Sequence, residues 1–169
     1  MELQGKNLAE LLANRFIMFN RSDELLIELM CSQLFIRWIT PSDDLLTIHD
    51  YGFIKFDWSE NDFGESILLS QTQQTPDPLP YRLTNDTSSP ISVDVSTYFP
   101  KSNYVKHVSG LGFETEGEEY VYILLLETEK EYIYIEGAPG LMEIRIATQE
   151  LEVDGYYQVI FTTKVEGDT

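Results

Sequence analysis

The sequence predicts a mainly β protein (α+β by strict count, because one short helix is also expected), and three observations lead to this prediction. β-branched and aromatic residues gather in short runs, and residues with turn propensity separate the runs. Residues 91–96 alternate between apolar and polar side chains, as in a strand with one buried face. Three strands in direct succession are predicted at residues 120–126, 131–136 and 141–146.

Residues 7–14 form the single predicted helix. Asn7 can cap it, Glu10 stands in the capping-box position, and leucines follow at helical spacing (Leu8, Leu11, Leu12). The strands expected after it are residues 16–19, 24–30, 33–39, 45–49 and 53–58. Cys31 falls in the tight connection between the second and third of these strands. It is interpreted as structural, since a thiol in acidic surroundings forms little of the reactive thiolate.

The composition changes after Trp58. Residues 57–65 combine several acidic residues with Gly64 and lack the ligand spacing of an EF-hand, so a solvated acidic loop is expected, with a cation site as the alternative. Residues 71–90 are predicted to be a loop-rich connector with a short strand, residues 67–70, before it. The remaining strands are expected at residues 91–99, 104–108, 111–115 and 156–164.

An internal repeat is predicted as well. Residues 23–50 align with residues 118–147 when two extra residues are allowed in one turn of the second segment. The prediction is therefore a single domain, residues 1–169, built from two related antiparallel β-meander halves, 8–58 and 103–165. The halves share one core, because about 50 residues bury too little apolar surface alone. Chance similarity between two series of short strands is the alternative.

The charge limits the kinds of partner. The chain has 29 acidic and 11 basic residues, a net charge of -18, and acids outnumber bases in both halves. This field argues against nucleic acid and anionic membranes as partners, because phosphate groups need a basic face, and it favours a basic protein partner. The alternative is that the acidity serves only solubility.

The sequence gives little sign of catalysis, cofactors or export. No apolar run can span a bilayer and the start lacks a signal-peptide layout, so a cytoplasmic location is expected. One cysteine and two histidines at unsuitable spacing argue against a metal site, so no cofactor is expected. No set of residues indicates a catalytic mechanism, which favours a protein that is not an enzyme.

The first functional hypothesis is a small acidic interaction protein that binds a basic protein, such as an inhibitor or immunity protein. Tyrosine provides a large rigid contact area, and neighbouring acids would suit a basic partner. The alternative is that Tyr120, Tyr122, Tyr132 and Tyr134 are ordinary sheet residues that pack across strands, since tyrosine and isoleucine alternate along residues 132–135. The candidate binding face consists of Tyr120, Tyr122, Tyr132, Tyr134, Glu118, Glu119 and Glu131.

The second hypothesis is a small-ligand-binding or enzymatic β-domain with a pocket between the halves. It predicts an apolar pocket that holds at least one histidine with a carboxylate in reach. Its candidate residues, besides tyrosines, are His49, His107, Trp38 and Trp58. The third hypothesis is a homo-oligomeric structural protein, in which an exposed strand edge forms a homodimer.

Overall fold

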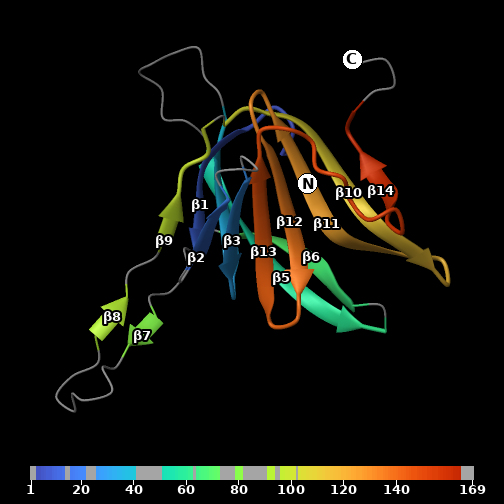
Figure 1. Ribbon diagram of the computed structural model, residues 1–169, viewed down its shortest axis with the longest axis horizontal. Helices are drawn as coiled ribbons and strands as arrows, with labels where there is room; N and C mark the ends of the chain where they lie inside the picture. The colour runs from blue at the N-terminus through green and yellow to red at the C-terminus, as the bar shows by residue number, and fades with distance from the viewer. Residues whose placement is uncertain are drawn as a thin grey trace.

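The computed structural model describes residues 3–13, 16–21, 26–40, 51–62, 64–72, 79–81, 91–93, 96–101 and 103–164. Within these residues the regular structure is entirely β, in two antiparallel sheets and a separate two-stranded hairpin (Figure 1). The prediction of a mainly β protein is confirmed.

The smaller sheet has five strands: β1 (Asn7–Ala13), β4 (Leu34–Ile39), β5 (Tyr51–Asn61), β6 (Gly64–Thr72) and β9 (Ser96–Tyr98). Their order is β6-β5-β4-β1-β9, so β4, β5 and β6 form a meander and β1 and β9 join it from distant parts of the chain. The separate hairpin pairs β7 (Leu79–Tyr81) with β8 (Ile91–Val93). The predicted strand 91–99 is therefore divided between this hairpin and the five-stranded sheet.

The larger sheet has seven strands: β2 (Ile17–Arg21), β3 (Leu26–Cys31), β10 (Val105–Thr115), β11 (Glu118–Thr128), β12 (Tyr132–Ala138), β13 (Leu141–Ala147) and β14 (Gln158–Thr162). Their order is β14-β10-β11-β12-β13-β3-β2. The three predicted successive strands are β11, β12 and β13, which do form a meander. The two strands predicted at residues 104–108 and 111–115 are one strand, β10.

The predicted N-terminal helix is wrong, because residues 7–13 form β1, paired with β4 on one side and β9 on the other. A bulge lies between Leu8 and Glu10, where the pairing register shifts by one residue. An extra residue changes which face the following side chains occupy. Leu8 and Leu11, three positions apart as on a helix face, consequently both reach the same core.

The predicted pair of related meander halves is not confirmed. β3 pairs with β13 and β2 in the seven-stranded sheet, whereas β4 pairs with β1 and β5 in the other sheet. The chain crosses between the sheets through Ser32 and Gln33, so the hairpin that the alignment required is absent from the described strands. The predicted strand 45–49 and most of the connector 71–90 lie outside the described residues.

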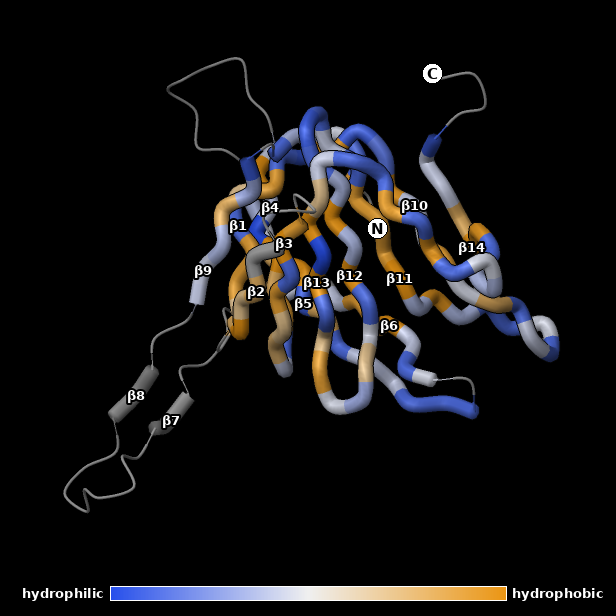
Figure 2. The backbone as a smooth tube through the Cα atoms, viewed as in Figure 1, coloured by the Kyte–Doolittle hydropathy of each residue, from blue (hydrophilic) through white to orange (hydrophobic). Residues whose placement is uncertain are grey.

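The main hydrophobic core lies between the two sheets and takes side chains from both. Hydrophobic residues run along the middle of the strands, and the tips of the β5–β6 and β10–β11 hairpins are mainly hydrophilic (Figure 2). Burial of these side chains supplies the main favourable term for folding. Its members include Leu8, Leu11, Leu29, Leu34, Ile36, Ile54, Phe56, Leu124, Leu126, Ile133, Ile135, Ile144 and Ile146.

Candidate functional site

A cavity of about 1020 Å³ lies on the side of the sandwich where β6 ends one sheet and β14 ends the other. Several of its lining side chains are solvent-exposed, so the cavity is open to ligands without a rearrangement of the core. The lining residues come from the segment before β1, from β6, β10 and β11, and from β14 and the chain beyond it. They are Gln4, Gly5, Leu69, Tyr104, Lys106, His107, Val108, Leu124, Phe161 and Thr163.

The segment before β1 is fixed against the start of β10. The Gly5 N–H donates to the Val105 carbonyl oxygen over 2.9 Å, and the Val105 N–H donates to the Lys6 carbonyl oxygen over 2.9 Å. Gly5 has a φ of 75°, which favours glycine, and Leu3 is buried in the core beside this turn. These bonds connect the two sheets and hold Gln4 at the cavity.

The opposite wall is built on the pairing of β10 with the chain at β14. The Val108 N–H donates to the Thr163 Oγ1 over 2.9 Å, and the Thr163 N–H donates to the Val108 carbonyl oxygen over 2.9 Å. Phe161 pairs with Gly110, and a Cβ atom built on Gly110 would lie 2.3 Å from the Phe161 Cε1. Glycine therefore lets the Phe161 ring lie flat on β10 and form part of the wall.

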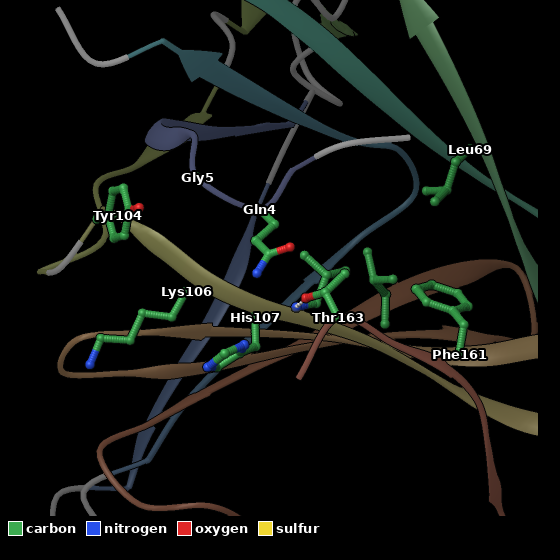
Figure 3. A pocket seen from close by; sticks show the side chains of 10 residues that line it. Gln4, Gly5, Leu69, Tyr104, Lys106, His107, Phe161 and Thr163 are labelled. Atoms are coloured by element: carbon green, nitrogen blue, oxygen red, sulfur yellow. Dashed lines mark hydrogen bonds between the residues drawn. The ribbon is translucent and has the colours of Figure 1, made fainter. Parts of the chain in front are cut away.

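The cavity has an apolar end and a polar end. Leu69 and Phe161 lie toward one end, and Tyr104, Lys106 and His107 lie toward the other, with further polar groups between them (Figure 3). No aspartate or glutamate is among the lining residues in the described part of the chain, although the sequence contains 29 acidic residues. A cavity of this form suits a ligand with an apolar body and a neutral or anionic polar group.

His107 borders the polar end of the cavity. It pairs with Glu127 of β11, so the two side chains lie on the same face of the sheet, and the Lys164 Nζ lies 3.4 Å from a Glu127 carboxylate oxygen. The His107 Nδ1 is buried and has no hydrogen-bond partner among the described residues. A histidine with a carboxylate on the neighbouring strand is thus present at a cavity. No nucleophilic side chain in the described ranges is hydrogen-bonded to it.

Neither Trp38 nor Trp58, the two tryptophans of the pocket hypothesis, lines this cavity. Trp38 packs against the core with its ring over Gly52, and the Lys6 Nζ lies 4.8 Å from the ring centroid. Trp58 also packs against the core. His49 lies outside the described residues. The lining residues that the sequence did not indicate, such as Leu69 and Phe161, are separated by most of the chain, and only the pairing of the strands brings them together.

The predicted tyrosine face is largely covered by the protein itself. Tyr134 is fully buried, and its hydroxyl accepts a hydrogen bond from the Leu151 N–H over 2.8 Å. Tyr122 is also buried, and its hydroxyl donates to the Asn61 Oδ1 over 2.7 Å. The chain beyond β13 packs on this side of the sheet through Leu151, Val153 and Tyr157. These two tyrosines therefore offer no area to a partner.

The glutamates of the predicted face have different environments. Glu131 is buried, and its carboxylate accepts a hydrogen bond from the Lys101 N–H over 2.9 Å, which ties the β11–β12 turn to the chain after β9. Glu118 and Glu119 are exposed at the start of β11. The Tyr120 hydroxyl donates to the Glu118 carboxylate over 2.6 Å. Tyr132 is half-buried, so the exposed part of the predicted face is the end of the β10–β11 hairpin.

A second, smaller hollow of about 310 Å³ lies where the tips of the β5–β6 and β10–β11 hairpins meet. Acidic side chains dominate its lining, which consists of Asn61, Asp62, Thr115, Glu116, Glu118 and Tyr120. The acidic segment 57–65, predicted to be a loop, belongs largely to the β5–β6 hairpin, and its Asp57 pairs with Lys55 over 2.6 Å. Among the described side chains, no group of three or more histidine, cysteine, aspartate or glutamate residues could hold a metal ion.

Cys31 lies at the end of β3 and is buried in the main core. Burial raises the pKa of its thiol from 9.0 to about 12. The thiol is therefore uncharged at neutral pH and has the low reactivity of a core cysteine, as the sequence predicted.

No protein-family model, curated protein or solved structure matches this chain. In the part of the chain that the structure describes, there is no helix of the length and apolar character needed to cross a membrane.

Proposed function

We propose that the protein binds a small, largely apolar molecule in the cavity between β6 and β14. One observation carries this proposal: a cavity of about 1020 Å³ extends from the exposed edge of the sandwich to buried core residues. Val108 and Leu124 belong to the core, and Leu69 and Phe161 continue the apolar lining to the solvent. Binding sites for small molecules are concave and mostly apolar, with few polar groups.

The exposed part of the lining favours the binding of an apolar ligand. Leu69 and Phe161 expose 37% and 42% of their surface in the free protein. A ligand that covers them removes apolar area from water, which is worth about 25 cal/mol per Å². The hydrogen bonds of Gly5 and Thr163 hold both walls in place beforehand, so little ordering cost opposes binding.

The test uses N-phenyl-1-naphthylamine, an uncharged apolar dye whose fluorescence rises when it leaves water. The variant Leu69→Asp places a charge in the cavity, and Leu68→Asp is its matched control. Leu68 is the adjacent residue of the same edge strand, is 51% exposed, and does not line the cavity. We expect saturable binding by the wild type and by Leu68→Asp, and loss of binding by Leu69→Asp. Absence of saturable binding by the wild type, or equal binding by both variants, would contradict the proposal.

A second candidate function is binding of a basic protein, as an inhibitor or immunity protein would do. The acidic hollow at the hairpin tips supports it, because Asp62, Glu116 and Glu118 could surround a lysine or arginine of a partner. The test measures the retention of a basic protein on the immobilised chain. We expect retention at low salt, release at high salt, and no retention by the double variant Glu116→Gln, Glu118→Gln. Glu152→Gln, an exposed site after β13, is the control. Retention that is indifferent to salt and to the double variant would exclude this function.

A further inference from the structure

We infer that the ligand is an amphiphile with an anionic head group, such as an alkyl carboxylate. Its head would lie beside Lys106 and its alkyl chain would extend toward Leu69 and Phe161. This inference rests on the proposed function, because it assigns a chemistry to the ligand of the same cavity. Three features of the cavity support it: the separation of its two ends, the sign of its charge, and the ammonium group of Lys106, which has no carboxylate partner among the described residues.

The separation of the ends determines the orientation of the ligand. Leu69 of β6 and Phe161 of β14 approach from the two sheet edges at one end of the cavity, and Lys106 lies at the other end (Figure 3). Between them, Gln4 and Thr163 provide neutral hydrogen-bonding groups. A ligand that is apolar throughout would gain no ionic contact with the exposed Lys106, and a ligand that is polar throughout would leave Phe161 against a polar surface.

The sign of the charge favours an anion over a cation. Among the described lining residues, lysine and histidine are the ionisable bases and none is a carboxylate, although acids outnumber bases by 29 to 11 in the chain. The net charge of -18 opposes the approach of an anion only weakly, since salt screens charges that lie beyond about 8 Å at physiological ionic strength. At contact distance the head group interacts chiefly with the Lys106 ammonium.

Lys106 has no carboxylate partner in the described ranges, unlike four other cationic side chains, which are Arg37, Lys55, Arg145 and Lys164. Arg37 pairs with Glu10 over 2.9 Å, and Arg145 pairs with Glu136 over 2.8 Å. Lys106 is also the extra residue of a bulge, because the register of β10 against β11 shifts between Val105 and His107. Bulges redirect side chains at the edges of sheets and beside binding sites. The bulge thus keeps Lys106 out of the regular ladder, at the mouth of the cavity.

The experiment compares three probes with the same alkyl chain, dodecanoate, dodecanol and dodecyltrimethylammonium. Each is titrated by calorimetry below its solubility limit, and the two charged probes also below their micelle concentrations. The proteins are the full-length wild type, Lys106→Gln, Lys106→Arg, Leu69→Asp and the control Leu68→Asp. We expect dodecanoate to bind more tightly than the other two probes. Lys106→Gln should weaken dodecanoate binding about fivefold, as for one exposed ion pair, and leave dodecanol binding unchanged. Lys106→Arg should retain the affinity for dodecanoate.

The outcomes separate this inference from the proposed function. Equal binding of dodecanol and dodecanoate, with no effect of Lys106→Gln, would overturn the anionic head group and leave the cavity as a binding site. Tighter binding of dodecyltrimethylammonium would overturn the inference in the same way. If no probe binds, or if Leu69→Asp binds as Leu68→Asp does, both the inference and the proposed function are wrong.

Discussion

The buried hydroxyl of Tyr134 gives the most direct test of how the chain beyond β13 is held against the seven-stranded sheet. This hydroxyl accepts a hydrogen bond from the Leu151 N–H over 2.8 Å and donates to the Leu151 carbonyl oxygen over 3.4 Å. The substitution Tyr134→Phe removes both bonds and keeps the ring, which packs in a hydrophobic cluster with Tyr122 and Ile123. The test therefore isolates the hydroxyl from the packing of the side chain.

The expected loss of stability depends on how well water can solvate the Leu151 N–H after the substitution removes its acceptor. A buried donor left without a partner costs about 1–3 kcal/mol. Leu151 is only half-buried, so water can reach part of its backbone, and the lower part of that range applies, about 1–2 kcal/mol. For a chain of this size, about 2–4 °C of Tm corresponds to each kcal/mol, so the Tm should fall by about 2–8 °C.

The assay is denaturant unfolding together with hydrogen exchange at the Leu151 amide. The control is Tyr132→Phe, since Tyr132 lies two residues away on the same face and its hydroxyl has no hydrogen bond among the described residues. We expect Tyr134→Phe to be less stable than Tyr132→Phe and to exchange its Leu151 amide faster. Equal stability of the two variants with unchanged exchange at Leu151 would refute the proposed role of the hydroxyl.

Three further predictions follow from the packing. Gly112→Ala should destabilise the fold by about 3 kcal/mol or more in denaturant unfolding, because the new Cβ would lie 1.8 Å from the Tyr120 carbonyl oxygen. The control Gly155→Ala should be nearly neutral, since its new Cβ would have no atom within 4 Å. The Cys31 pKa of about 12 exceeds its ordinary value of 9.0, so the thiol contributes stability that is complete below about pH 9 and is lost as the pH rises toward 12. The unfolding free energy of Cys31→Ala should therefore approach that of the wild type between pH 9 and 11, and a constant difference would contradict this. A fragment of residues 1–80 should lack a cooperative thermal transition by circular dichroism, because it separates β3 from its partner β13.

The strands were predictable from the sequence where the pattern of side chains reports burial directly. The alternation along β12 places Ile133 and Ile135 in the main core and Tyr134 on the opposite face, as the sequence indicated. The identity of β1 was not predictable, because its bulge gives Leu8 and Leu11 the spacing of a helix face. Bulges depend on the neighbouring strand, and the sequence of one strand carries no clear sign of them.

The pairing of the strands was harder to predict from the sequence than their positions were. Cys31, Ser32 and Gln33 have the length of a tight hairpin turn, yet the chain there passes from one sheet to the other. Short connections occur both within and between sheets, so length alone does not decide between them. The candidate cavity depends on this pairing, since Leu69 of β6 and Phe161 of β14 line one cavity only because the strand order puts both strands at sheet edges.

The cavity follows from the way in which β6 approaches the other sheet. At its first residues β6 is in close contact with β12, where a Cβ atom on Gly137 would lie 2.6 Å from the Glu65 carbonyl oxygen. Leu69 lies four residues further along β6, which corresponds to about 13 Å at the usual rise of a strand. At Leu69 the cavity lies between β6 and the strands β10 and β14. Glycine at position 137 therefore lets the two sheets approach closely at one end of β6, while a cavity is open at Leu69, further along the same strand.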